Sequence, residues 1–261
     1  MYIAIDLGGT NARISCSENL NDVKFEKIIK FELSHNFEND YGKIIEAIKN
    51  VSGGDVKAIG IGTPGTYSED KKNLISAKNL SEWVEKSFVN YFSKEFGCPV
   101  FADNDAVVAS LGEYYYGQNK KKDFLYLTWG TGIGGSNLKS NAGKLISEKI
   151  DWDLHLREFN IQCGGYGIEK RFNKPASCLN NEEWDSVMND FVLYISDISE
   201  KLAQSEIILG GGATVKQKER LKEVIEKLAK KKINLRLSNL NDEVGLFGAI
   251  ALIATKLNLK Q

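Results

Sequence analysis

Two segments of the chain share one pattern of apolar and polar positions. In each, an apolar run ends in a glycine turn that carries a threonine, and more strand-like sequence follows; they are Ile3–Ser15 and Leu125–Leu138. Glycine lets the backbone approach a ligand closely, so that successive N–H groups can converge on phosphate oxygens. The pattern therefore predicts a duplicated phosphate-binding hairpin, with one nucleotide held between the two turns.

Strand and helix periodicities alternate along the rest of the first half. Apolar residues occupy odd positions from Val23 to Leu33, the spacing of a half-buried strand, which predicts a three-stranded meander at the start of the fold. The elements expected next are a helix through Ile44–Val51, a strand at 56–62, a helix at about Ser81–Gly97, a strand at 99–103 and a helix from Asp105.

A lysine run at Lys120–Lys122 is typical of an exposed connection, and we place the lobe boundary and a candidate hinge there. We expect a smaller lobe at residues 1–118, onto which a C-terminal helix at about 245–261 packs back, and a larger lobe at 119–244. The larger lobe should contain the second hairpin, a poorly patterned stretch at 143–181, a helix near 182–204 and the strand of EIILGGG. This order predicts an α/β fold of two lobes, each a mixed sheet flanked by helices.

Composition narrows the function. In 261 residues, 34 Lys and Arg nearly balance 35 Asp and Glu, so no basic excess favours nucleic-acid binding, and we expect a small-molecule partner. The four cysteines form no CxxC pair, and no apolar run approaches the roughly 20 residues of a membrane helix. These features predict a cytoplasmic protein with no membrane partner.

Two familiar nucleotide motifs are excluded. GTGIGG at Gly130–Gly135 and GIGTPG at Gly60–Gly65 satisfy G-x-G-x-x-G, but neither opens a helix within a strand-helix-strand unit, as a dinucleotide-binding fold requires. No glycine turn carries the Lys-Ser or Lys-Thr pair of a P-loop. Each turn taken alone could equally be a tight hairpin that uses glycine for geometry.

Asn104 and Asp105 lie where a predicted buried strand gives way to a helix. Asn and Asp often cap helix N-termini, so capping alone is one interpretation. The other is chemical: Asp105 accepts a proton from a hydroxyl nucleophile, and Asn104 orients that hydroxyl. Local sequence leaves both open.

Seven segments, in order, resemble the ROK family of sugar kinases, within the superfamily of sugar kinases and actin-like ATPases. They are DLGGTNAR from Asp6, GIGTPG from Gly60, NLSEW from Asn79, FADNDA from Phe101, LTWGTGIGG from Leu127, ILGGG from Ile208 and VGLFGA from Val244. The resemblance implies an actin-like ATPase fold with duplicated ribonuclease H-like lobes, and a sugar and ATP that meet between them. It implies ATP-dependent phosphorylation of a hexose, glucose or a close relative, at the 6-hydroxyl.

The resemblance also implies residue roles. Asp105 would be the general base, Asn104 and Gly65 would bind the sugar, and Asp6 would face magnesium. The nucleotide would be bound by Asp6, Gly8, Gly9, Thr10, Asn11, Thr131, Gly132, Gly210, Gly211 and Gly212.

Beyond the second hairpin the chain departs from the family, whose Gly-Glu-x-Gly-His and zinc-binding CxCGxxGC segments are both incomplete. Counting from Gly130 aligns His155 with the family histidine and leaves Asp153, or Asp151, in place of its glutamate. Glu169 matches a glutamate that touches the sugar in the family.

A structural zinc site needs four ligands, and His155 and Cys163 supply at most two, so no structural zinc is predicted. We expect ordinary packing to hold this region instead, with these aromatic residues as candidates: Trp152, Phe159, Tyr166 and Phe172. Val107 and Ser136 replace an asparagine and a glycine of the family motifs, so the sequence leaves the choice of sugar open.

Other functions remain open. A sugar-sensing regulator of this family would carry a DNA-binding extension ahead of the first phosphate motif, which we do not expect in a chain that starts at that motif. An actin-like structural ATPase would need no Asn104–Asp105 pair, whereas a polyphosphate-using glucokinase would fit the same turns. The family commonly forms dimers, so a homodimer also stays open.

Overall fold

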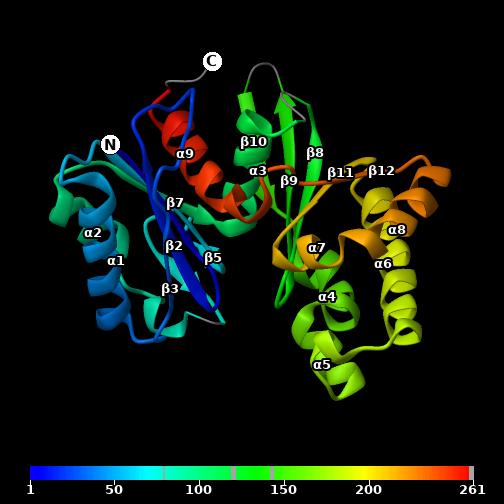
Figure 1. The fold of residues 1–261 in the computed structure, drawn as a ribbon. Coiled ribbons are helices and arrows are strands. Elements are labelled where there is room, and N and C mark those ends of the chain that lie inside the picture. The colour runs from blue at the N-terminus through cyan, green and yellow to red at the C-terminus, as the bar shows by residue number, and fades with distance from the viewer. Residues whose placement is uncertain (79, 119–121, 142–143, 259–261) are drawn as a thin grey trace. The chain divides into compact units, whose positions relative to one another are not determined.

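The computed structural model describes residues 1–78, 80–118, 122–141 and 144–258, and the chain folds into two compact units. The first comprises Met1–Lys120 with Glu243–Gln261 and holds more residues than the second, Lys121–Asp242. Each unit contains a five-stranded mixed sheet flanked by helices (Figure 1), which confirms the predicted α/β class. The expected boundary adjoins residues 119–121, and these lie outside the described residues.

The sheet of the first unit has the strand order β3-β2-β1-β4-β7. These strands are β1 (Tyr2–Leu7), β2 (Asn11–Ser17), β3 (Ile29–Glu32), β4 (Ala58–Thr63) and β7 (Val100–Asn104). The first three form the predicted antiparallel meander, and β4 and β7 extend it in parallel with β1. A separate two-stranded hairpin, β5 (Thr66–Tyr67) and β6 (Leu74–Ser76), follows β4.

The third strand is shorter than its alternating pattern predicts. Val23 and Phe25 precede β3, and neither pairs with a strand among the described residues. The Phe25 ring instead packs edge-on against Phe247 of helix α9 (Val244–Lys256), with centroids 4.9 Å apart. Phe25 is therefore buried by a residue distant in sequence and not by a place in the strand that the local pattern predicted.

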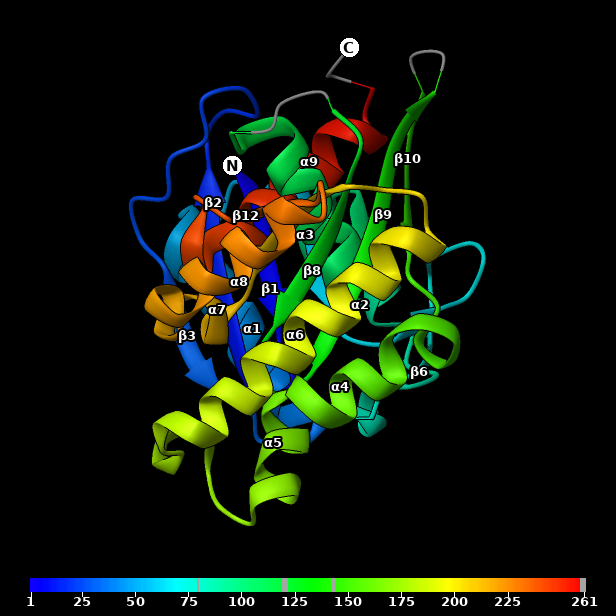
Figure 2. The ribbon, with the colours of Figure 1, turned by 90° about the vertical axis from the view of Figure 1, so that its right-hand side faces the viewer.

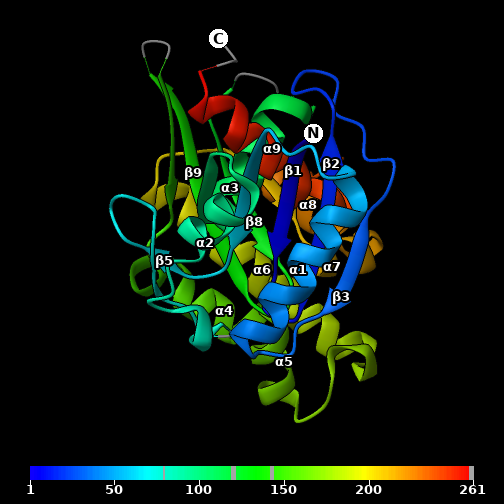
Figure 3. The same ribbon diagram turned by 90° about the vertical axis from the view of Figure 1, so that its left-hand side faces the viewer.

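In the described part of the chain, four α-helices flank this sheet. Helices α1 (Phe37–Ser52) and α2 (Phe88–Phe96) lie on one face, and α3 (Asp105–Tyr116) and α9 lie on the other (Figures 1 and 3). The limits of α1 follow from its sequence: the Asn36 side chain accepts from the Asn39 N–H at its start, and Gly53, at φ 63°, ends it in the left-handed conformation.

The prediction of a single helix over Ser81–Gly97 is wrong. The segment forms a short 3-10 turn at Ser81–Trp83, a further turn in which Glu85 has φ 62°, and then α2. The buried Trp83 ring packs against Phe37 and Phe88, at centroid distances of 4.8 and 5.4 Å, which requires the chain to leave the helix between the turn and α2. Asn79, at the start of the NLSEW motif, lies outside the described residues.

Helix α9 packs on its neighbours through glycines. A Cβ atom on Gly248 would overlap the Val108 carbonyl of α3, and one on Gly112 would lie 2.8 Å from the Gly248 nitrogen. A Cβ atom on Gly60 of β4 would overlap the Ala249 carbonyl. From Val244 to Ala254 the helix carries no polar side chain, and most of these residues are buried.

The second unit repeats the first architecture, with the strand order β10-β9-β8-β11-β12. Its strands are β8 (Phe124–Trp129), β9 (Ile133–Asn141), β10 (Lys144–Lys149), β11 (Glu206–Gly210) and β12 (Asn234–Leu237). An antiparallel meander again meets two parallel strands. Helices α4 (Arg157–Cys163), α6 (Asn181–Lys201) and α8 (Lys218–Lys230) lie across this sheet (Figure 2).

Several elements of this unit were not predicted from the sequence. The poorly patterned stretch contains β10, a π-helical turn at Trp152–Leu156, α4, and α5 (Gly165–Phe172). Helices α7 (Gly212–Lys216) and α8 and strand β12 received no assignment. For α8 a signal was available, because Leu221, Val224 and Leu228 are buried at helical spacing.

Alanine replacements of a crowded glycine in α9 and of an uncrowded glycine in α1 should change the stability in opposite directions. Gly248→Ala places a methyl group against the Val108 carbonyl, and we expect it to lower the free energy of unfolding by on the order of 3 kcal/mol. Gly42→Ala, in the exposed interior of α1 with no atom near the added carbon, should raise it by roughly 0.5–1 kcal/mol. Urea unfolding measures both. Equal stability of Gly248→Ala and the parent protein would contradict this packing.

Candidate functional site

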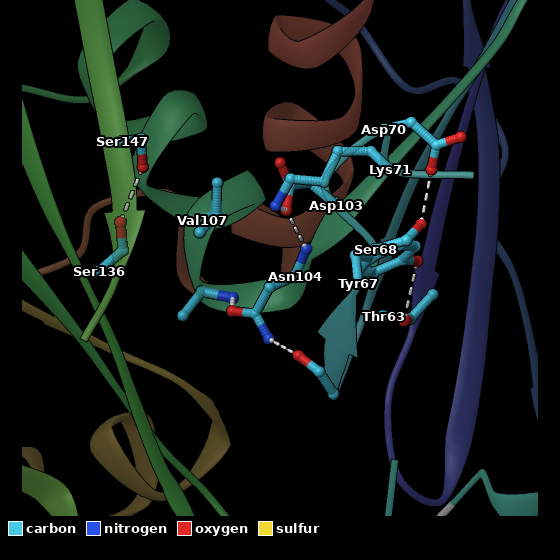
Figure 4. A network of polar contacts seen from close by, with 12 residues as sticks. Thr63, Tyr67, Ser68, Asp70, Lys71, Asp103, Asn104, Val107, Ser136 and Ser147 are labelled. Atoms are coloured by element: carbon cyan, nitrogen blue, oxygen red, sulfur yellow. Dashed lines mark hydrogen bonds and ion pairs between the residues drawn. The ribbon is translucent and has the colours of Figure 1, made fainter. Parts of the chain in front are cut away.

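Asn104 and Asp105 stand together at the junction of β7 and α3. The Oδ1 atoms of both side chains accept from the Ala106 N–H, at 3.1 Å from Asn104 and 2.9 Å from Asp105. The Asn104 Nδ2 donates to the Gly65 carbonyl oxygen at 3.0 Å (Figure 4). Asn104 is therefore a helix cap and is also tied to Gly65, so the two interpretations from the sequence do not exclude each other.

Gly65 can make this contact only as glycine. Its φ of 123° lies in the left-handed region, and a Cβ atom there would overlap the Ser76 carbonyl of β6. A buried contact braces the same turn, because the Thr63 and Tyr67 hydroxyls lie 3.1 Å apart. Burial raises the pKa of the Tyr67 phenol above its usual range, so this hydroxyl stays protonated.

The first glycine turn joins β1 to β2. The Gly8 N–H donates to the Asn11 carbonyl at 2.8 Å, and the Thr10 carbonyl accepts from the Leu33 N–H at 2.9 Å. The Gly9 and Thr10 amides donate to no acceptor among the described residues. Two neighbouring backbone donors of this turn are thus available to an anion.

Asp6, at the end of β1, is positioned by two residues that the sequence analysis did not assign. The Arg13 Nη1 lies 3.1 Å from its Oδ2. A Cβ atom on Gly245 would lie 2.5 Å from the Asp6 Cγ, so only glycine admits this carboxylate beside the first turn of α9, where the helix dipole favours a negative charge. The VGLFGA motif contained the signal for Gly245.

The second glycine turn, between β8 and β9, is held by the junction of α4 and α5. The Asn160 Oδ1 accepts from the Ile133 N–H at 2.8 Å, and the Gly130 carbonyl accepts from the Gly165 N–H at 3.0 Å. For the Thr131 and Gly132 amides, the described part of the chain offers no acceptor. Nothing in the sequence singled out Asn160.

The third glycine segment lies against this second turn. Strand β11 runs parallel to β8, with Gly210 opposite Thr128. Gly211 has φ 95°, and a Cβ atom on it would overlap the Trp129 carbonyl. The fold therefore brings Gly210 and Gly211 beside the end of β8 at Trp129, and Gly212 follows as the first residue of α7. The family resemblance implied nucleotide contacts for all three.

The three residues aligned with the incomplete family motifs differ in how far they are buried. His155 lies in the π-helical turn, and its buried Nδ1 has no hydrogen-bond partner among the described residues. Asp153 in the same turn and Glu169 on α5 are both exposed. The unpartnered Nδ1 makes His155 the one of these three with a free polar atom already withdrawn from solvent.

This region is held by packing and backbone contacts. The Trp129 Nε1 donates to the Cys163 carbonyl at 2.7 Å, and the Phe159 ring is fully buried. The expectation for Tyr166 is wrong, because its side chain is 47% exposed, whereas Phe172 packs at the edge of the core. The Trp152 side chain lies outside those described.

Potential metal ligands are dispersed over the described residues. Burial raises the pKa of the Cys163 thiol and so disfavours the thiolate that zinc binds. In the described ranges, no three His, Cys, Asp or Glu side chains cluster as a metal site. Magnesium is different, because it keeps several waters and needs only one or two carboxylates beside substrate phosphates, so Asp6 fits that ion.

The family model of the ROK family matches residues 2–144. The chain belongs to the ROK family. A glucokinase of Thermotoga maritima is 32% identical over 136 residues, which cover 51% of this chain and 43% of that protein. A xylose repressor of Caldicellulosiruptor bescii is 26% identical over 190 residues, which cover 68% of this chain and 47% of the repressor. The chain thus spans about half the length of the curated relatives it matches.

Solved structures show the same fold. A ROK family glucokinase from Streptomyces griseus, in complex with glucose and AMPPNP, superposes with a TM-score of 0.74 at 19% identity, covering 96% of this chain and 98% of that one. This confirms the actin-like ATPase fold that the motifs implied. Within the described residues, no helix combines the length and apolar character that a membrane crossing requires.

The contact between Asn160 and the second turn can be tested without a ligand. Asn160→Ala removes the acceptor of the Ile133 N–H, a loss of about 1 kcal/mol, so hydrogen exchange at Ile133 should accelerate about fivefold. Asn160→Asp keeps an oxygen there and should preserve slow exchange. Equal exchange rates in Asn160→Ala and the parent protein would show that Asn160 does not hold the turn.

Proposed function

We propose that this ROK family member is an ATP-dependent hexose kinase that phosphorylates glucose or a close relative at the 6-hydroxyl. The observation that carries the proposal is the junction of β7 and α3, where Asn104 and Asp105 share the Ala106 N–H and Asn104 reaches Gly65. A carboxylate at a strand end, beside a fixed amide, suits proton abstraction from a bound hydroxyl.

On the sugar side, Asp105 accepts the hydroxyl proton and Asn104 orients that hydroxyl. Asn104 is 5% exposed, and its Nδ2 is fixed by Gly65, so it presents one orientation to a ligand. We assign further sugar contacts to His155, through its unpartnered Nδ1, and to Asp153 and Glu169.

On the nucleotide side, the two glycine turns supply backbone donors to the phosphates. These donors are the Gly9, Thr10, Thr131 and Gly132 amides, with Gly8 and Asn11 closing the first turn. Gly210, Gly211 and Gly212 would lie near adenosine. Magnesium, when bound, neutralises phosphate charge, and Asp6 would hold it through water.

A sugar-sensing regulator without turnover is the second candidate, because a xylose repressor aligns with 68% of this chain. Such a protein binds sugar but needs no general base. Turnover that depends on Asp105 separates the two functions.

The deciding experiment measures ADP release with magnesium and ATP over a panel of glucose, mannose, fructose, N-acetylglucosamine, N-acetylmannosamine and allose. Asp105→Asn should lower turnover on the accepted sugar by about 10² to 10⁴. Its melting temperature should stay unchanged, because the new amide oxygen still accepts the Ala106 N–H. Asp22→Asn, which alters an exposed carboxylate, is the matched control.

The outcomes distinguish the candidates. Full turnover in Asp105→Asn would remove that residue from the mechanism. No sugar-dependent ADP release from the parent protein would end the kinase proposal, and sugar binding measured by calorimetry would then favour the regulator. Replacing ATP by polyphosphate in the same assay tests the donor.

A second prediction concerns magnesium. Gly245→Ala places a methyl group against the Asp6 carboxylate and displaces it, so the magnesium concentration that gives half-maximal turnover should rise about 10- to 100-fold. Sugar KM should not change. If the magnesium dependence of Gly245→Ala matches that of the parent protein, Asp6 does not act on the metal.

A further inference from the structure

Lys71 lies in the turn of the β5–β6 hairpin and reaches the end of β7. Its Nζ lies 2.9 Å from the Asp103 Oδ1, one residue before Asn104 (Figure 4). The Lys71 side chain is 42% exposed, and that of Asp103 only 11%. The hairpin therefore supplies a charge-assisted hydrogen bond to a carboxylate that is largely withdrawn from solvent.

Asp103 transmits this contact to the proposed sugar site. The same Oδ1 atom accepts from the Asn104 N–H at 2.8 Å. Lys71 therefore helps to set the direction of the Asp103 carboxylate, and Asp103 in turn fixes the backbone from which the Asn104 side chain projects.

The turn that carries Lys71 is closely braced. The Lys71 N–H donates to the Ser68 carbonyl at 2.9 Å, and the Ser68 N–H donates to the Asn73 carbonyl at 2.9 Å. The Ser68 hydroxyl donates to Asp70 at 2.6 Å, and this bond lowers the pKa of the Asp70 carboxyl. Lys71 has φ 58°, a conformation that favours glycine, yet the chain places a long charged side chain there.

The hairpin thus holds Asn104 at two points. Near its base, the Gly65 carbonyl accepts from the Asn104 Nδ2, and at its turn Lys71 acts through Asp103 on the Asn104 N–H. One contact fixes the side chain and the other fixes the backbone of the same residue.

We propose that Lys71 is a positioning residue that sets the sugar affinity of the site through Asp103 and Asn104. This inference rests on the proposed function. Lys71 acts through its neighbours, so it is expected to affect sugar KM and not the nucleotide. An ion pair with one half-exposed partner contributes little to global stability, so this role differs from a structural one.

The test uses four single variants and one double variant of the full chain. Lys71→Met removes the charge and keeps the length of the side chain, and we expect it to raise sugar KM about tenfold, since small displacements at a site lower its efficiency strongly. The KM for MgATP and the melting temperature should stay unchanged. Lys71→Arg should restore most of the affinity, and Lys72→Met, at the exposed neighbouring lysine, should behave as the parent protein.

The fourth variant, Asp103→Asn, tests the route. Adding Lys71→Met to Asp103→Asn should raise sugar KM no further, because the two residues act in series. Additive effects would show that Lys71 acts independently of Asp103.

An active enzyme with unchanged sugar KM in Lys71→Met overturns the inference alone. The inference is also overturned if Lys71→Met raises the KM for sugar and the KM for MgATP equally and lowers the melting temperature. If the parent protein phosphorylates no sugar, the proposed function fails, and sugar-binding calorimetry on the same variants then decides the role of Lys71. Weaker sugar binding by Lys71→Met supports it, whereas equal binding, or no binding by the parent protein, overturns it.

Discussion

The first unit depends on how closely helix α9 approaches its neighbours. Gly60 and Gly248 let the backbone of α9 meet strand β4 and helix α3 without intervening side chains. This approach places the N-terminal turn of α9 against β1, where Gly245 leaves room for the Asp6 carboxylate. A segment from the far end of the chain therefore completes both the core of this unit and the surroundings of its proposed metal-facing residue.

The glycine turns of the two units are held in place by different contacts. In both units, the glycine turn joins two antiparallel strands, and parallel strands continue the sheet beside them. In both turns, two backbone N–H groups have no acceptor among the described residues. Each turn has a backbone bond of its own, from the Gly8 N–H to the Asn11 carbonyl in the first unit and from the Gly130 N–H to the Gly132 carbonyl in the second. In the first unit, the Leu33 N–H supports the turn from outside by donating to the Thr10 carbonyl. In the second, helix α4 contributes Asn160, and the start of α5 contributes the Gly165 N–H.

The stretch that lacks the full family zinc motif shows how packing can hold such a turn. Trp129 precedes the second turn, and its indole N–H donates to the Cys163 carbonyl while its ring packs on Phe191 at 4.5 Å. Phe159 of α4 meets the same Phe191 ring at 4.8 Å. A buried aromatic cluster thus fixes the position of α4, and with it the Asn160 oxygen beside the turn.

The sequence by itself determined the fold class, the two hairpins and the strand-to-helix position of Asn104 and Asp105, because apolar period and glycine spacing are local properties. It failed where distant residues meet: Phe25 left its predicted strand to pack on Phe247, and Trp83 ended the predicted helix early. Only the tertiary structure decided the partners of the site, such as Lys71 for Asp103 and Asn160 for the second turn. Such pairs depend on which strand ends and helix ends the packed core brings within hydrogen-bonding distance, and no local pattern records that.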